Sequence, residues 1–476
     1  MFKIIKNYLY TFGYQLFAIV VPLATSPYIT RELGANQFGT SSFIIANMQY
    51  FVMIATLGIT TYGQRSIAYV RNDKKKRSKI FYEIELLSII LTIITTILFS
   101  IYVYYFGRQL WLEYSVSYFS ILACCLDISW FFMGLENFKV IVVRNMIIKI
   151  LTILLVFTIV RGKYSLILYL LIVSLSTLLG NLTLWPYLKA ELIRVKLKTL
   201  SPLYHFKYTL GLFLPQISST IYIILNKIIL GYICSRTETG YFDNSDKIVK
   251  MSLTVITSIA TVVMPQAAAA YANNDIDKIN SFLKKSIDFV LLCSFPMMFG
   301  LMAISIPFST WFFGKQYSAV GPVLLIEAIA ILPIGCSVII AQQYLVPTKK
   351  VRIYTLSTVI GAIVNMSICW YLDIHFQAVG TAIATVITEV LVTIIDLYFI
   401  RNNVRISNLF NDIWKFLISS IVMFIILQLL ICRINFNIFT LILLMVLGIL
   451  IYIICIFITK PEILENIKIL LSRFNR

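Results

Sequence analysis

A lysine stands alone in a long apolar stretch near the middle of the chain. Lys227 lies within residues 217–230, Ile-Ser-Ser-Thr-Ile-Tyr-Ile-Ile-Leu-Asn-Lys-Ile-Ile-Leu, a pattern typical of a membrane-spanning helix. An ammonium group at that depth costs about 2.5–3.5 kcal/mol on insertion scales. It is expected to face the protein interior, water or an anionic ligand, or to extend to the membrane interface.

Three other cations are candidates to bind the same kind of anion. Lys247 and Lys250 are three residues apart, so they share one face of a predicted helix. Arg31 ends the first predicted span beside a glycine-rich turn. The alternatives are an interfacial position for the two lysines and a local ion pair for Arg31 with Glu32.

Carboxylates inside predicted spans could carry a proton or an ion that drives transport. Asp127, Glu327 and Glu389 are the candidates, because an intramembrane carboxylate is costly and is kept there mainly for function. Structural pairing within residues 127–139 is the alternative for Asp127. No metal site is predicted: the eight cysteines lie in or at the ends of apolar spans, and buried small hydrophobes explain them best.

The composition indicates a polytopic membrane protein. Of 476 residues, 59% are hydrophobic and 13% are charged, which is too much apolar surface for a soluble domain to bury. No cleavable signal is evident, and the first helix is expected to remain. The net charge of +19 is explained by basic membrane loops rather than by nucleic-acid binding. No nucleotide-binding signature occurs, so no cofactor is predicted.

Hydropathy predicts an all-α protein with about 14 transmembrane helices. With the N-terminus inside, cytoplasmic segments hold about 30 basic residues and outer segments about 9. This bias places both termini in the cytoplasm. The outer loops are short, which disfavours a membrane glycosyltransferase or polymerase with a large external domain. The chain is therefore predicted not to be an enzyme.

A weak internal repeat predicts how the spans are grouped. Leu33-Gly34 followed by Phe38-Gly39 recurs loosely as Leu230-Gly231 followed by Gly240-Tyr241, at an offset of about 200 residues. Chance matches between apolar sequences are the alternative for each pair alone. A duplication in this order predicts two six-helix lobes around a central cavity plus a terminal helix pair. The predicted parts are 1–206, 207–405 and 406–476.

Several motifs resemble those of bacterial oligosaccharide-lipid flippases of the O-antigen (Wzx) type. Residues 27–39, Pro-Tyr-Ile-Thr-Arg-Glu-Leu-Gly-Ala-Asn-Gln-Phe-Gly, resemble the end of their first span. Residues 127–139, Asp-Ile-Ser-Trp-Phe-Phe-Met-Gly-Leu-Glu-Asn-Phe-Lys, resemble their fourth span. Residues 240–247 and Met264-Pro265 resemble their eighth span. The likeness extends over essentially the whole chain and places it in the multidrug/oligosaccharidyl-lipid/polysaccharide exporter superfamily.

The resemblance implies alternating access and a substrate of undecaprenyl-pyrophosphate-linked oligosaccharide, an O-antigen or capsule repeat unit. This substrate would move from the inner to the outer leaflet of the bacterial cytoplasmic (inner) membrane. The implied partners are the lipid bilayer, a polysaccharide polymerase and a chain-length regulator. Gln49, Gln216 and Asn226 could then bond sugar hydroxyls, with helix–helix hydrogen bonds as the alternative.

One departure separates the chain from the lipid II branch of the superfamily. That branch has a basic–acidic pair in the middle of its first span, where this chain has Ala24-Thr25-Ser26. A lipid II substrate is therefore disfavoured. A cation-coupled small-molecule or drug antiporter of the same superfamily remains the alternative function.

Overall fold

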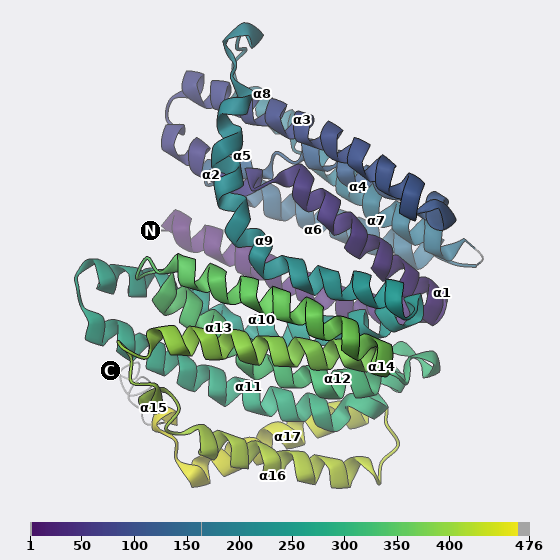
Figure 1. Ribbon diagram of the computed structural model, residues 1–476, viewed down its shortest axis with the longest axis vertical. Helices are drawn as coiled ribbons and strands as arrows, with labels where there is room; N and C mark the ends of the chain where they lie inside the picture. The colour runs from purple at the N-terminus through teal and green to yellow at the C-terminus, as the bar shows by residue number, and fades with distance from the viewer. Residues whose placement is uncertain (1, 163, 465–476) are drawn as a thin grey trace. The chain divides into compact units, whose positions relative to one another are not determined.

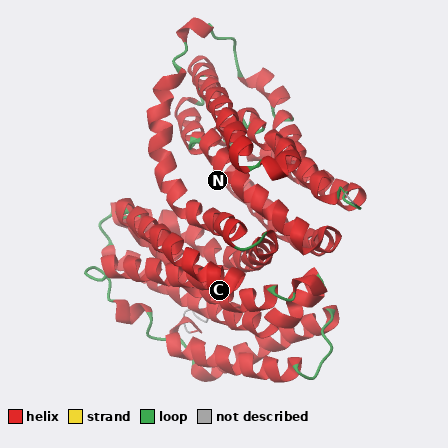
Figure 2. Cartoon of the chain, turned by 45° about the vertical axis from the view of Figure 1, so that its right-hand side comes forward, coloured by secondary structure: helices red, strands yellow, loops and turns green. Residues whose placement is uncertain are grey.

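The computed structural model describes residues 2–162 and 164–464, and within these ranges it is helical with no strand (Figure 2). The chain forms two compact units, Met1–Ile228 and Ile229–Arg476. We call them the N-terminal unit and the C-terminal unit. The prediction of an all-α polytopic protein is confirmed.

The N-terminal unit contains the first eight α-helices and most of the ninth (Figure 1). Their bounds are α1 (Phe2–Thr56), α2 (Ile59–Val70), α3 (Lys74–Phe106), α4 (Trp111–Leu122), α5 (Ser129–Gly134), α6 (Phe138–Ile159), α7 (Ser165–Leu182), α8 (Leu188–Glu191) and α9 (Pro202–Ile233). Four 3₁₀ turns lie between them: η1 (Arg108–Leu110), η2 (Cys124–Leu126), η3 (Trp185–Tyr187) and η4 (Leu197–Thr199).

The C-terminal unit continues from the end of α9. Its helices are α10 (Arg236–Ala272), α11 (Ile276–Phe313), α12 (Val320–Glu327), α13 (Ile331–Ile340), α14 (Val351–Ile400), α15 (Ile406–Leu409), α16 (Ile413–Ile431) and α17 (Ile438–Thr459). The short segments are η5 (Lys315–Tyr317), η6 (Ala328–Ala330) and the π-helical turn η7 (Ala341–Leu345).

Eleven segments of the described chain are long and apolar enough to cross a membrane. Two of these segments contain more than one span. α1 has 55 residues and α14 has 50, or about 83 Å and about 75 Å at 1.5 Å per residue, against a hydrocarbon core of about 30 Å. The backbone leaves helical geometry inside each, at Gly34 and at Gln377. With both divided and the 32-residue α9 added, the described chain provides the predicted fourteen spans.

The break in α1 depends on a glycine. Gly34 has φ 69° and ψ 170°, a conformation that residues with a Cβ rarely adopt. The same residue belongs to the Leu33-Gly34 pair of the predicted repeat. The sequence therefore places a glycine where the chain must end one span and begin the next.

Close packing between α2 and α5 builds the part of the N-terminal unit that holds the site. A Cβ at Gly63 would collide with the ring of Trp130, so only glycine lets the two helices approach this closely. Trp130 and Phe81 of α3 stack with ring centroids 5.5 Å apart. Both side chains are 1% exposed, so α2, α3 and α5 share one well-packed core.

Ion pairs join three turns at one end of the N-terminal unit. Arg71 pairs with Glu136 at 2.7 Å, and Arg77 pairs with Glu191 at 2.9 Å. Lys74 Nζ donates to the Ala190 carbonyl at 2.8 Å. The α2–α3, α5–α6 and α8–α9 connections thus meet, as expected for the loops that the sequence places on one side of the membrane.

The terminal helix pair packs on α11 within the C-terminal unit (Figure 1). Gln428 Nε2 donates to the Ala303 carbonyl at 3.1 Å, and the Tyr452 hydroxyl donates to the Leu292 carbonyl at 2.9 Å. The sequence-based division sets this pair apart as 406–476 and places the lobe boundary at 206/207. The two compact units divide instead at 228/229, within α9.

All eight cysteines are free thiols. Cys124, Cys336 and Cys369 are buried, as expected for small apolar residues. Cys432 is exposed, in the turn between α16 and α17.

Candidate functional site

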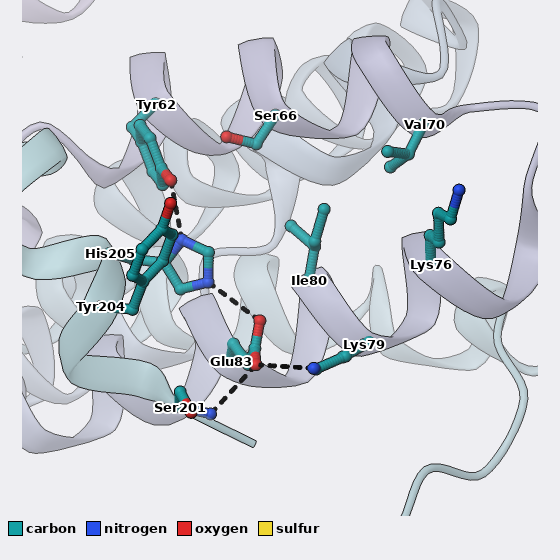
Figure 3. A pocket seen from close by; sticks show the side chains of 10 residues that line it. All are labelled: Tyr62, Ser66, Val70, Lys76, Lys79, Ile80, Glu83, Ser201, Tyr204 and His205. Carbon is teal, nitrogen blue, oxygen red and sulfur yellow. Dashed lines mark hydrogen bonds and ion pairs between the residues drawn. The ribbon is translucent and has the colours of Figure 1, made fainter. Parts of the chain in front are cut away.

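A pocket of about 430 Å³ opens where α2, α3 and the first turn of α9 meet in the N-terminal unit (Figure 3). Its lining combines two lysines, a histidine, a glutamate and two tyrosines with smaller side chains. The residues are Tyr62, Ser66, Val70, Lys76, Lys79, Ile80, Glu83, Ser201, Tyr204 and His205.

Glu83 is the centre of the bonding in this pocket. Its Oε2 lies 3.0 Å from His205 Nε2, and its Oε1 accepts a hydrogen bond of 3.0 Å from the Ser201 backbone N–H. Lys79 Nζ lies 3.8 Å from Oε1. Glu83 is 6% exposed, and a buried carboxylate needs partners of this kind to remain charged.

His205 links Glu83 to α2. Its Nδ1 lies 2.7 Å from the Tyr62 hydroxyl, while its Nε2 faces Glu83 (Figure 3). A neutral imidazole with its proton on Nε2 satisfies both contacts, since Nδ1 then accepts from the tyrosine and Nε2–H donates to the carboxylate. The chain Tyr62–His205–Glu83 therefore ties the start of α9 to both α2 and α3.

The mouth of the pocket is aromatic and basic. Tyr62 and Tyr208 stack with centroids 6.0 Å apart, and the Tyr204 and Tyr208 hydroxyls lie 3.4 Å apart. Lys76 is largely exposed at the rim and also pairs with Asp73 at 3.6 Å.

The hydrogen bonds of the pocket anchor the beginning of α9. Glu83 bonds to Ser201 just before the helix and to His205 in its first turn. The same helix carries Lys227 and runs across the 228/229 division between the two units. The site therefore fixes the end of the element that connects them.

Lys227 is half-buried in α9, six residues before the helix ends. Its neighbour Asn226 is 1% exposed. Ile228 packs against a buried cluster that includes Phe43 and Phe99, so this part of α9 lies against the second part of α1 and against α3.

Lys247 and Lys250 each have a carboxylate partner one turn earlier in α10. Lys247 Nζ lies 2.7 Å from Asp243, and Lys250 Nζ lies 2.6 Å from Asp246. Both aspartates are buried, at 6% exposure. An anion that binds either lysine must therefore compete with an ion pair already formed.

The other predicted ligand residues have varied positions. Arg31 and Gln49 are exposed, both on α1. The side chain of Gln216 lies outside the described part of the structure. Their roles as substrate ligands stay predictions.

The predicted ion-coupling carboxylates lie on three different elements. Asp127 is half-buried, and its Oδ1 accepts a 3.0 Å hydrogen bond from the Ser129 N–H. Glu327, at the end of α12, is 2% exposed, and Glu389 of α14 is 6% exposed. All three are inside candidate spans.

Two buried carboxylates of the N-terminal unit, Glu83 and Glu85, were not predicted as site residues from the sequence. Glu83 pairs with a histidine 122 positions away, a contact that no local pattern reveals. Glu85 is 5% exposed in the apolar part of α3. Its signal was available: it is an acidic residue inside a predicted span.

Comparison with known proteins agrees with a membrane transport protein. The family described as "Polysaccharide biosynthesis protein" matches residues 4–270, more than half of the chain. A "Putative O-antigen transporter" of Shigella dysenteriae is 24% identical over 396 residues, which cover 82% of this chain and 98% of that protein. One of the same name from Escherichia coli (strain K12) is 24% identical, covering 84% and 97%.

The fold is similar to that of solved flippases and exporters. A structure of the lipid II flippase MurJ, in an inward closed conformation, aligns with a TM-score of 0.76 and 17% identity, covering 94% of this chain and 98% of that one. An inward-facing multidrug resistance MATE transporter of the MOP superfamily aligns with a TM-score of 0.63 and 15% identity, covering 82% and 96%. At these identities the likeness concerns the fold alone.

The fold is thus the one shared with the MurJ and MATE structures. The chain belongs to the polysaccharide biosynthesis protein family. The resemblance to Wzx-type flippases found in the sequence motifs is confirmed.

Proposed function

We propose that the protein moves an undecaprenyl-pyrophosphate-linked oligosaccharide from the inner to the outer leaflet of the bacterial cytoplasmic membrane, by alternating access. The observation that carries the proposal is the alignment with two O-antigen transporter relatives along 98% and 97% of their lengths. A protein of Haloferax volcanii named as a probable low-salt glycan biosynthesis flippase, Agl15, supports it with 22% identity over 218 residues, 46% of each chain.

A pyrophosphate head group needs cations or water on its path, because an unpaired phosphate charge in hydrocarbon costs many kcal/mol. Lys227 is the leading candidate, since it is half-buried within the membrane-length α9. Lys247 and Lys250 rank below it because Asp243 and Asp246 already neutralise them. Snorkelling to the interface is the competing role for Lys227.

The proposed orientation places both termini in the cytoplasm. The meeting of three basic turns in the N-terminal unit supports it, because all three are then on the cytoplasmic side. The Glu83 pocket would lie on that side as well. Glu327 and Glu389 remain proposed coupling residues, and a polymerase and chain-length regulator remain proposed partners.

The test is export in host strains that lack their own flippase and that each make one lipid-linked glycan. We expect at least one surface glycan to be restored, as measured by surface labelling of intact cells. Absence of surface glycan across the panel, with the protein present in the membrane, would contradict the proposal. Gained drug resistance in those strains would instead support an antiporter.

The role of Lys227 is tested with Lys227→Ala and Lys227→Arg in the strain that responds. We expect export to fall about tenfold or more with alanine, since an uncompensated phosphate charge costs over 1.4 kcal/mol, and to be kept with arginine. Lys207→Ala is the matched control, because Lys207 is an exposed lysine of the same helix. Full export by the alanine variant would remove Lys227 from the substrate path.

A further inference from the structure

A second carboxylate of α3, Glu85, lies in a markedly different environment from Glu83. It is 5% exposed, and neither of its oxygens has a hydrogen-bond partner among the described residues. An ionised carboxylate in such a place is strongly disfavoured unless a cation accompanies it.

Among the described residues, no positive charge interacts with Glu85. Asp127 and the Cys125 thiol are the titratable groups that interact with it, and an ionised Asp127 would repel its charge. Arg144 of α6 donates to Asn181 Oδ1 at 2.9 Å, and Asn181 donates to the Ala123 carbonyl at 2.8 Å. That guanidinium is therefore bonded to a side chain of α7.

The backbone facing Glu85 is broken within a candidate span. Residues 108–134 form one membrane-length segment, yet η2 ends at Leu126 and Asp127 is extended, with φ −81° and ψ 95°. Non-helical backbone at membrane depth is tolerated only where protein or water satisfies it. Here Trp185 Nε1 donates to the Leu126 carbonyl at 3.1 Å, while Asp127 accepts from Ser129.

A line of buried polar side chains extends from Glu85 along the same face of α3. Ser88, Thr92 and Thr95 follow it at helical spacing, with exposures of 4%, 2% and 0%. The hydroxyl of Thr95 has no hydrogen-bond partner among the described residues, and that of Thr92 lies beside the Cys125 thiol. From Glu85 to Thr95 the line covers about 15 Å, half of the hydrocarbon core.

We propose that Glu85 and Asp127 form a proton-binding site that loads and unloads one proton during transport, with the hydroxyl line of α3 as its path. The proton forms an O–H bond at one carboxyl and leaves to water when that bond breaks. A proton neutralises Glu85 without the ligand shell that a metal ion requires. As a coupling site, this inference rests on the proposed transport function.

The proton site is tested on purified protein by infrared spectroscopy, without substrate. We expect the wild type to show a protonated-carboxyl C=O band that disappears at alkaline pH, and Glu85→Gln to lack it. Asp127→Asn should change the frequency or the pH dependence of the band, because the neighbouring carboxyl is removed. Glu83→Gln should leave the band unchanged.

Two outcomes would overturn the inference. One is the absence of any band that differs between the wild type and Glu85→Gln. The other is a band that Asp127→Asn does not move, since the two carboxyls would then not share a site. The spectra are recorded without glycan, so either result leaves the proposed transport function unaffected. Conversely, a failure of export in cells would not change the infrared band.

The coupling role is tested by the pH profile of export. We expect export by the wild type to depend on external pH, Glu85→Gln to lose this dependence, and Glu85→Asp to keep it. A purely structural role would lower export equally at every pH. An unchanged profile in Glu85→Gln would contradict coupling through this site.

Discussion

Glu83 and Glu85 are two residues apart on α3 and face opposite sides of the helix. Glu83 has a histidine, a backbone N–H and a lysine around it. Glu85 has no hydrogen-bond partner among the described residues and an acidic neighbour. The contrast shows that helix geometry, rather than residue type, decides which carboxylate holds the structure together and which can exchange a proton.

A buried carboxylate of the C-terminal unit has a charged partner, as Glu83 does. Asp288 is 2% exposed and pairs with Lys284 at 3.3 Å, and Lys284 also contacts Glu462 at 2.9 Å. A cation in the next helical turn thus supplies the charge that Glu85 lacks. Glu85 is therefore unusual for its missing partner and not for its burial.

The largest effect is expected from Glu83→Ala. It removes the acceptor of His205 and Ser201 together, so we expect the free energy of unfolding to fall by about 3 kcal/mol. Thermal unfolding in detergent measures the loss, and hydrogen exchange in residues 202–210 locates it. Unchanged exchange in that turn would show that Glu83 does not anchor α9.

A smaller effect is expected from Tyr62→Phe. This change removes only the hydroxyl on His205 Nδ1, worth about 1 kcal/mol, and keeps the stacking with Tyr208. The same unfolding measurement applies. A loss as large as that of Glu83→Ala would show that Tyr62, rather than Glu83, is the main anchor of α9.

A third carboxylate, Asp73, lies just before α3 and provides a pH test. Its Oδ1 accepts from the N–H groups of Lys75 and Lys76, and this bonding lowers the pKa of Asp73 below its usual value. The contribution of Asp73 to the free energy of unfolding is therefore present above its unfolded pKa of about 3.9. This contribution is lost as pH falls through the lower pKa of the folded state. Asp73→Ala should be less stable than the wild type at neutral pH, and the two should converge in acid. A constant difference across this range would contradict the cap.

The smallest effect on stability is expected from Glu85→Gln. Because Glu85 has no bonded donor to lose, the free energy of unfolding should change by less than about 1 kcal/mol. Thermal unfolding of Glu85→Gln and Glu83→Ala, measured under the same conditions, makes the comparison. A loss near 3 kcal/mol would reveal a structural role for Glu85 and remove the contrast between the two faces.

The sequence predicted the number of spans because apolar length and breaking glycines are local signals. Gly34 is an example, since it marks both the repeat and the break in α1. The positive charge of the basic turns predicted that they lie together on one side of the membrane. The pairing of Lys247 with Asp243 could also have been predicted, because the two residues are four apart.

The contacts of Glu83 that anchor α9 could not be predicted in the same way. His205 reaches Glu83 only because the chain between them folds back through five helices, and no periodicity encodes such a contact. The isolation of Glu85 is equally nonlocal. It depends on which side chains of neighbouring helices fail to reach it, and this is decided by packing.

The exposed thiol at Cys432 offers a reporter of sidedness. It lies in the turn after the thirteenth span, so the proposed orientation puts it on the outer side of the cytoplasmic membrane. A membrane-impermeant maleimide added to intact cells should then modify it, and Cys432→Ser should abolish that signal. Labelling only after the cells are lysed would invert the topology, and with it the side from which the Glu83 pocket is reached.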